Sequence, residues 1–195
     1  DLPPLAAVLS HMDFLLTNDP GTMHLAAGLG VPVAAVFLAT AQPFDTGPYL
    51  EGALSLEPDL PCHPCSFGEE CPRGLACREA VDGEAVGELL ASAMDGNPEV
   101  PRGGAGRVWE ARRDGRGYMD LVSLSGHGRE DRSLWIAIQR DVYRQFFDRC
   151  QDAAAPAWPG GDTDFRRNLA AELERCCLML TLLEEQGRLL VLRPD

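Results

Sequence analysis

The sequence predicts an α/β fold that is followed by an α-helical hairpin. Near the N-terminus, short apolar runs typical of buried strands alternate with segments whose apolar residues have helical spacing. Toward the C-terminus, apolar residues recur at steps of three and four over residues 135–150 and 165–183, as they do in amphipathic helices. A Pro- and Gly-rich segment separates these two helices and predicts the turn of the hairpin.

The elements of the first half follow from local pattern. They are a helix over residues 3–12, a strand at Phe14–Thr17, a helix that ends at Gly28-Leu29-Gly30, a strand at Val33–Leu38 and a helix at Gly83–Met94. Pro3 and Pro4 suit a first helical turn, and the continuous apolar run Val33–Leu38 is typical of a parallel strand that is covered on both faces. Two parallel strands cannot form a stable sheet alone. We expect the missing strands to precede residue 1 in a longer protein, and a separate chain segment is the alternative.

Composition divides the chain in two. Residues 1–95 hold fourteen acidic residues against only Arg73 and Arg78, whereas residues 96–195 hold sixteen acidic residues against fifteen arginines. Turn-forming residues dominate 95–104, which predicts a linker. We therefore expect one domain over 1–95, and a linker with a helical extension over 96–195.

The charge and the apolar runs exclude several classes of protein. A net charge of -13 argues against nucleic acid as a partner, because phosphate backbones are bound through excess basic residues. No apolar run approaches the length of a transmembrane helix, and no N-terminal stretch has the pattern of a signal peptide. We expect a cytoplasmic chain that does not span the membrane.

The segment Asn18-Asp19-Pro20-Gly21-Thr22-Met23-His24 is a candidate anion site. It follows a predicted strand and opens a predicted helix, and the first N–H groups of a helix have no partner within the helix. A phosphate group is a suitable ligand for such N–H groups. The alternative is a tight turn in which Asp19 caps the helix and His24 is half-buried.

Four cysteines lie close together in the pattern C-x2-C-x5-C-x5-C: Cys62, Cys65, Cys71 and Cys77. This spacing suits tetrahedral coordination of Zn²⁺ or ligation of an iron–sulfur cluster. Reduced thiols and a disulfide are the alternatives, and we expect no obligatory cofactor.

Several motifs in the first half occur together in an order that resembles one family. They are Leu5-Ala6-Ala7-Val8-Leu9, Phe14 to Asp19, Gly21 to Ala27, Val31 to Phe37, Thr46-Gly47-Pro48-Tyr49 and the cysteine segment up to Cys77, and the similarity ends near Ala93. They resemble the C-terminal region of the glycosyltransferase family 9 heptosyltransferases, which pass heptose from ADP-heptose to the inner core of lipopolysaccharide. The chain departs from the family at Leu38-Ala39, where the family usually has Gly-Pro. The helical extension has no counterpart in this resemblance.

The resemblance implies a GT-B fold, in which two Rossmann-like domains face a cleft, and the chain would supply the last part of the C-terminal domain. The backbone at Gly21, Thr22 and Met23 would bind the ADP diphosphate, with Asn18, Asp19 and His24 beside the donor. Thr46 and Gly47 are candidate donor contacts.

The catalytic base of the family lies in the N-terminal domain, so no residue of this chain is assigned to that role. The acceptor would be a lipopolysaccharide core. The helical extension would pack on the transferase domain or dock it at the inner face of the inner membrane. The alternative function is a non-catalytic binding or assembly module in which the cysteine loop is a structural staple.

Overall fold

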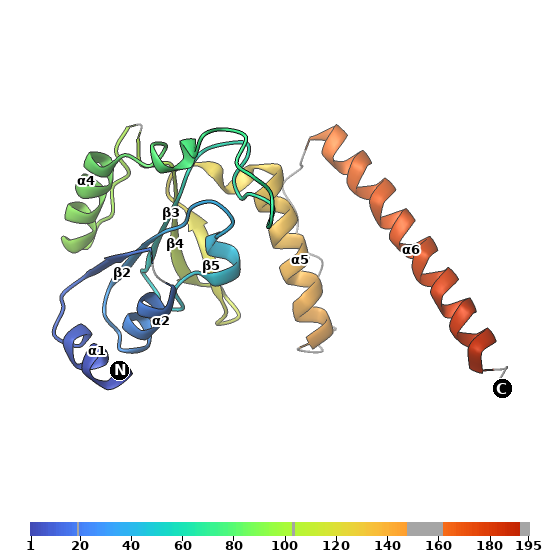
Figure 1. Ribbon diagram of the computed structural model, residues 1–195, viewed down its shortest axis with the longest axis horizontal. Coiled ribbons are helices and arrows are strands. Elements are labelled where there is room, and N and C mark those ends of the chain that lie inside the picture. The colour runs from blue at the N-terminus through green and yellow to red at the C-terminus, as the bar shows by residue number, and fades with distance from the viewer. Residues whose placement is uncertain (19, 103, 148–161, 192–195) are drawn as a thin grey trace. The chain divides into compact units, whose positions relative to one another are not determined.

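The computed structural model describes residues 1–18, 20–102, 104–147 and 162–191 (Figure 1). The chain divides into two compact units, Asp1–Gly128 and Arg129–Asp195. The first unit contains a mixed five-stranded sheet with helices on both faces, and the second contains two long helices. This arrangement confirms the predicted α/β class and is compatible with a Rossmann-like domain.

The strands lie in the sheet in the same order as in the sequence. They are β1 (Leu15–Thr17), β2 (Val33–Val36), β3 (Leu54–Glu57), β4 (Arg107–Arg113) and β5 (Met119–Ser123). β1, β2 and β3 are mutually parallel, whereas β4 and β5 run antiparallel to their neighbours. The carboxyl ends of β1, β2 and β3 therefore meet at one edge of the sheet.

Helices cover both faces of this sheet. α1 (Leu2–Leu9) and α2 (Pro20–Gly28) contribute to one core, and α4 (Gly83–Met94) contributes to the other. Ala35 belongs to the first core and Ala34 to the second, because successive side chains of a strand point to opposite faces. This two-sided burial explains why β2 is apolar at every position.

Short elements complete the first unit. α3 (Pro43–Thr46) lies between β2 and β3, the 3-10 helix η1 (Ala76–Arg78) precedes α4, and η2 (His127–Arg129) follows β5. The expected helix at Gly83–Met94 is confirmed at both ends, and Asp82 caps it by accepting a hydrogen bond from the Ala85 N–H at 2.9 Å.

Three strands were missing from the sequence prediction. The expectation that the remaining strands precede residue 1 overlooked β3, β4 and β5, which this chain itself supplies. β4 and β5 form a hairpin whose turn is held by the Asp114 carboxylate, since it accepts hydrogen bonds from the N–H groups of Arg116 and Tyr118, both at 2.9 Å. The pairing of β3 with β4 spans about fifty positions and leaves little local pattern. The β4–β5 hairpin is local, but charged residues interrupt its apolar pattern, and these two facts explain the omission.

The sheet also continues past the predicted boundary at residues 95 and 96. The segment between α4 and β4 packs back onto the first unit, where the Asp82 N–H donates to the Gly104 carbonyl at 2.6 Å. Gly106 has φ +71°, and a Cβ there would collide with the Glu57 carbonyl oxygen. Residues 96–195 are therefore more than a linker and a helical extension, and the compact units divide after Gly128.

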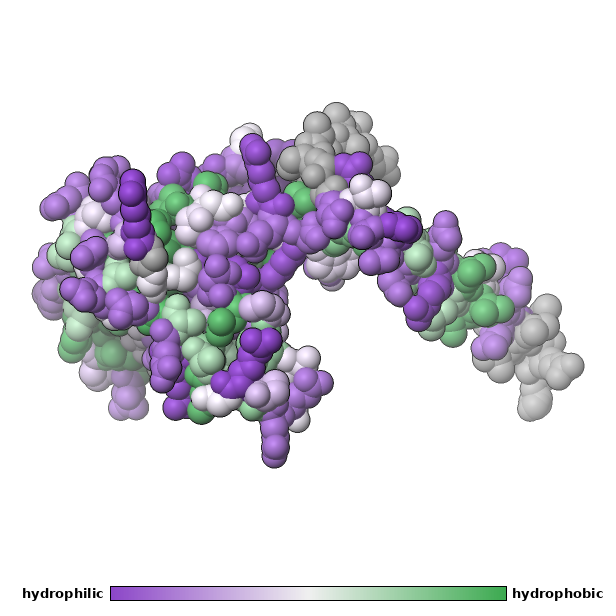
Figure 2. Space-filling model, turned by 90° about the horizontal axis from the view of Figure 1, so that it is seen from above, coloured by the Kyte–Doolittle hydropathy of each residue, from purple (hydrophilic) through white to green (hydrophobic). Residues whose placement is uncertain are grey.

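The second unit contains both predicted helices, α5 (Asp131–Phe147) and α6 (Thr163–Val191). The expected turn between them and Cys150 lie outside the described residues, so the antiparallel packing of the hairpin stays a prediction. Apolar side chains lie at the surface of α6 (Figure 2), and Leu178 and Leu180 are each 66% exposed. No helix in the described part of the chain is both long and apolar enough to cross a membrane.

The position of β3 in the middle of the sheet gives a stability prediction. The Leu56→Ala variant removes a side chain that is completely buried in the core beneath α4, and we expect the free energy of unfolding to fall by about 2–5 kcal/mol. Leu16→Ala on the edge strand β1 is the matched control, because Leu16 is 49% exposed, and should cost less than about 1 kcal/mol. Urea unfolding followed by circular dichroism measures both, and equal losses would contradict the central position of β3.

Candidate functional site

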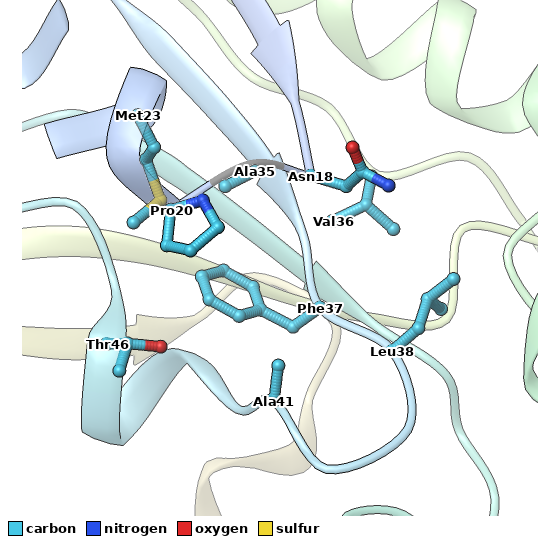
Figure 3. A pocket seen from close by; sticks show the side chains of 9 residues that line it. All are labelled: Asn18, Pro20, Met23, Ala35, Val36, Phe37, Leu38, Ala41 and Thr46. Atoms are coloured by element: carbon cyan, nitrogen blue, oxygen red, sulfur yellow. The ribbon is translucent and has the colours of Figure 1, made fainter. Parts of the chain in front are cut away.

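A cavity lies at the carboxyl ends of the parallel strands (Figure 3). Its volume is about 170 Å³. The residues that line it are Asn18, Pro20, Met23, Ala35, Val36, Phe37, Leu38, Ala41 and Thr46. Ligands of open α/β sheets bind at this edge, outside the carboxyl ends of the strands. The cavity is therefore the candidate site.

The walls of the cavity are mostly apolar. Figure 3 shows the Phe37 ring in the middle of the group, with Pro20 on one side and Ala41 on the other. The Asn18 amide and the Thr46 hydroxyl are the polar side-chain groups of the lining. Pockets that enclose a whole drug-sized ligand span about 300–1,000 Å³. This cavity fits one part of such a ligand.

Three of the residues that the sequence predicts for the site line this cavity, namely Asn18, Met23 and Thr46. The others lie close in the sequence but outside the lining: Gly21, Thr22 and His24 belong to the first turns of α2, and Gly47 ends α3. His24 is exposed. Asp19 lies outside the described residues.

The start of α2 lies beside the cavity. α2 begins at Pro20, and both Pro20 and Met23 line the cavity from its first turn. Met23 is 1% exposed and anchors this turn in the core. Because the N-terminus of a helix carries a partial positive charge, the cavity adjoins a place where an anion is stabilised.

The loop after β2 forms another wall of the cavity. Ala39 has φ +56°, a left-handed conformation that glycine adopts with less strain. At this position the family that the chain resembles usually has Gly-Pro, whereas this chain has Leu38-Ala39. The Ala39 carbonyl accepts a hydrogen bond from the Cys65 N–H at 2.8 Å, so the cysteine loop holds this conformation in place.

A buried polar network contacts the same loop. Glu57 and His63 have fully buried side chains, and His63 Nδ1 lies 3.4 Å from Glu57 Oε2. Trp109 Nε1 donates a hydrogen bond to Glu57 Oε1 at 3.1 Å. His63 Nε2 lies 3.1 Å from the carbonyl oxygen of Ala41, a residue of the cavity wall. The network thus joins β3, β4 and the cysteine loop to the candidate site.

The partners of His63 constrain its protons. A carbonyl oxygen only accepts, so Nε2 carries a proton and donates to Ala41. Nδ1 faces a carboxylate oxygen, and these two atoms attract each other only when a proton lies between them. The geometry therefore places one shared proton between His63 Nδ1 and Glu57 Oε2, either as an imidazolium beside a carboxylate or as a neutral imidazole beside a carboxylic acid.

The four predicted cysteine ligands lie in the loop between β3 and α4. Cys77 is buried, Cys62 and Cys65 are half-buried and Cys71 is exposed, and none of them is in a disulfide. Hydrogen bonds from the Arg73 and Leu75 N–H groups lower the pKa of the Cys71 thiol. Burial raises the pKa of the Cys65 thiol, and the charges of its cysteine neighbours raise it further.

The sequence analysis did not identify Glu57, His63 and Trp109 as a group. Glu57 follows the segment Ala53–Leu56, which is apolar except for Ser55, and a charged residue at the end of a buried strand was the available signal. Trp109 is separated from Glu57 by 52 positions, so no local pattern links the two. The apolar wall residue Phe37 was assigned to a strand rather than to the site.

Residues 1–75 match the model of glycosyltransferase family 9 (heptosyltransferase). This match confirms the resemblance over that part of the chain, is consistent with a partial fragment of the family and supports a glycosyltransferase in general terms. It contains the whole lining of the cavity. Neither the curated proteins nor the solved structures gave a significant match to the chain.

The buried network gives a stability prediction. The Trp109→Phe variant keeps an aromatic ring against Phe44, whose centroid lies 4.9 Å away, but removes the indole N–H that Glu57 accepts. We expect the free energy of unfolding to fall by about 1–3 kcal/mol, because the buried carboxylate loses a donor. Trp135→Phe, at a half-buried position of α5, is the control for denaturant unfolding. Equal losses in the two variants would show that the hydrogen bond to Glu57 contributes nothing.

Proposed function

We propose that this chain forms the donor-binding side of a glycosyltransferase, on the premise that residues 1–75 match glycosyltransferase family 9. The transferase would pass a sugar from a nucleotide-sugar donor such as ADP-heptose to a lipopolysaccharide core or a related acceptor. The observation that carries the proposal is the cavity at the carboxyl edge of the sheet, beside the start of α2.

The geometry supports a division of roles within the donor. The diphosphate lies at the first turn of α2, where the backbone of Gly21, Thr22 and Met23 supplies N–H groups and the helix dipole favours negative charge. A ring of the donor fits the apolar cavity against Phe37. Thr46 offers a hydroxyl to polar groups of that ring.

His24 is the side chain of this region that can carry a positive charge toward a phosphate. It is exposed on α2, one turn after the helix begins. A protonated imidazole donates a charge-assisted hydrogen bond to a phosphate oxygen. Asp19 lies outside the described residues, and we propose that it caps α2 or accepts from donor hydroxyls.

The proposed reaction is an inverting displacement in a GT-B enzyme. An acceptor hydroxyl loses its proton to a base and attacks the anomeric carbon, and the bond from that carbon to the diphosphate oxygen breaks so that ADP leaves. The start of α2 would stabilise the negative charge that develops on the leaving diphosphate. We assign the base to the N-terminal domain of the GT-B fold, and no residue of this chain to that role.

The acidity of the chain does not exclude an anionic donor. Most of the net charge of -13 falls within residues 1–95, which hold fourteen acidic residues and two arginines, but charges further apart than about 8–10 Å are largely screened at physiological salt. Binding then depends most on the groups nearest the donor. In this proposal they are the backbone dipoles of α2, the side chain of His24 and the carboxylate of Asp19.

A second function is a non-catalytic binding or assembly module. The exposed apolar side chains of α6 favour it, because large apolar patches at a surface mark contact sites. In a transferase, the same extension would pack on the enzyme or dock it at the inner face of the inner membrane. Nucleotide binding distinguishes the two functions, since only the transferase requires it.

The cavity gives a binding prediction. We expect the chain to bind ADP in isothermal titration calorimetry and the Ala41→Phe variant to lose detectable binding, because the added ring fills the cavity beside Phe37. Ala41 is exposed, so this change does not overpack the core. Ala91→Phe, at an exposed position of α4, is the matched control and should bind like the parent chain.

A second variant tests the role of His24. The exposed position of this side chain limits the value of one hydrogen bond to phosphate, so His24→Ala should weaken ADP binding by about threefold to tenfold. No ADP binding by the parent chain, or equal binding by parent and Ala41→Phe, would refute the proposed donor site.

A further inference from the structure

The cysteine loop between β3 and α4 has chemistry that the donor site does not use. It brings four thiols together from one segment, at Cys62, Cys65, Cys71 and Cys77. Cys62 and Cys65 lie close to the cavity wall, since the Cys65 N–H bonds to the Ala39 carbonyl. Cys77 lies in η1 and is 8% exposed.

The backbone after Cys71 has an unusual conformation that directs an N–H group at the Cys71 sulfur atom. Gly74 and Leu75 follow it with φ +58° and +66°, so two consecutive residues are left-handed. This conformation is strained for a leucine, and Leu75 is 43% exposed, so burial of its side chain does not explain the strain. It does aim the Leu75 N–H at Cys71 Sγ, at 3.3 Å. N–H groups directed at a sulfur atom favour the thiolate, which is the form that binds metal.

The charges of the other three cysteines act on Cys65. Burial raises the pKa of its thiol, and the charges of Cys62, Cys71, Cys77 and Glu69 raise it further. Among the described residues, however, no three of the four sulfur atoms lie within 4.8 Å of one another. The four thiols therefore share one loop but do not form a closed tetrahedral site in this structure.

The arginines of the cysteine loop supply positive charge for a metal–thiolate site. Arg73 and Arg78 are the only basic residues within positions 1–95, and each lies one or two positions from a cysteine of this loop. A divalent cation bound by four thiolates carries a net charge of -2, which two arginines balance. Glu69 and Glu70 belong to the same loop and oppose this balance, and the charge of Glu69 raises the pKa of the Cys65 thiol.

We propose that the cysteine loop binds one Zn²⁺ ion through the four thiolates of Cys62, Cys65, Cys71 and Cys77. Each Zn–S bond replaces an S–H bond, and the proton goes to solvent, so no oxidant or reductant is needed. The ion draws the four sulfur atoms into tetrahedral coordination and closes the loop. The site is structural, because all four positions around the metal are occupied by the protein.

The metal also acts on the donor site. Closing the loop fixes the Cys65 N–H against Ala39 and the His63 ring against Ala41, and these contacts hold the loop after β2 that forms a wall of the cavity. Zinc binding does not rest on the proposed function, whereas this effect on the donor does.

Metal analysis of the full chain, purified with a reductant and without chelator, tests the site. We expect about one zinc per chain, and the visible absorption of tetrahedral cobalt thiolate after replacement by Co²⁺. Cys71→Ser should remove both. The double variant Cys176→Ser/Cys177→Ser changes two exposed cysteines of α6 and should retain both, which controls for the loss of thiols in general.

A variant outside the ligands keeps the test valid if Cys71→Ser fails to fold. Arg73→Glu, at an exposed position, should weaken zinc binding at least tenfold in competition with a chromophoric chelator, and Arg113→Glu on β4 should not. The proposal would be overturned if the purified chain contained no metal and its four loop thiols reacted freely with a thiol reagent. A mass lowered by two hydrogens for each disulfide, or the absorption of an iron–sulfur cluster, would also overturn it.

Chelation separates the two parts of the inference. Removing zinc from the parent chain should weaken ADP binding, and restoring Zn²⁺ should recover it. Stoichiometric zinc together with unchanged ADP affinity would overturn the coupling to the cavity. Absence of ADP binding with zinc present would refute the donor site and leave the metal site established.

Discussion

The fold of the first unit depends on a carboxylate that is completely buried at the end of β3. An unpaired charge in such a place costs several kcal/mol, so Glu57 requires partners before the sheet can close around it. Trp109 from β4 and His63 from the cysteine loop are those partners. Trp109 is 52 positions from Glu57 in the sequence, whereas His63 is six positions away. The need to satisfy one side chain therefore fixes where β4 inserts and where the cysteine loop folds back.

The same requirement shapes the candidate site. β4 runs antiparallel to β3 and carries Arg107 to the carboxyl edge, where its guanidinium bonds to the Pro58 carbonyl at 3.3 Å and pairs with Asp59 at 3.0 Å. The contacts of Glu57 and those of Arg107 thus hold the end of β3 beside the cavity. His63 joins the Glu57 contacts to Ala41, and Phe44 of α3 packs edge-on against Trp109. The cavity is lined by β2, α2, α3 and the loops that follow β1 and β2, and contacts with Cys65 and His63 fix the loop after β2.

The sequence predicted the parts of this structure that are set by local pattern. α4 was predicted at both ends because its cap and its apolar periodicity lie within one segment, and β2 because continuous apolar residues indicate burial on both faces. The β4–β5 hairpin is local but was missed, because charged residues interrupt the apolar pattern of its strands. β3 was missed, since its pairing with β4 depends on residues about fifty positions apart. The same holds for the site: Asn18 and Thr46 were found from the motif, whereas the network of Glu57 was not. The exposed His24 and the glycines of the motif lie beside the cavity and not in its lining.

The distribution of charge explains how an acidic domain can present a site for an anion. Only Arg73 and Arg78 are basic within residues 1–95, and both belong to the cysteine loop, so neither is part of the cavity lining. A diphosphate at the carboxyl edge would then be stabilised mainly by backbone dipoles, which α2 supplies because β1 leads directly into its first turn. A dipole acts only over the first turn of a helix, so the position of α2 matters more than its composition. Met23, buried beneath that turn, fixes the position by packing, so the proposed affinity for an anion would depend on the hydrophobic core.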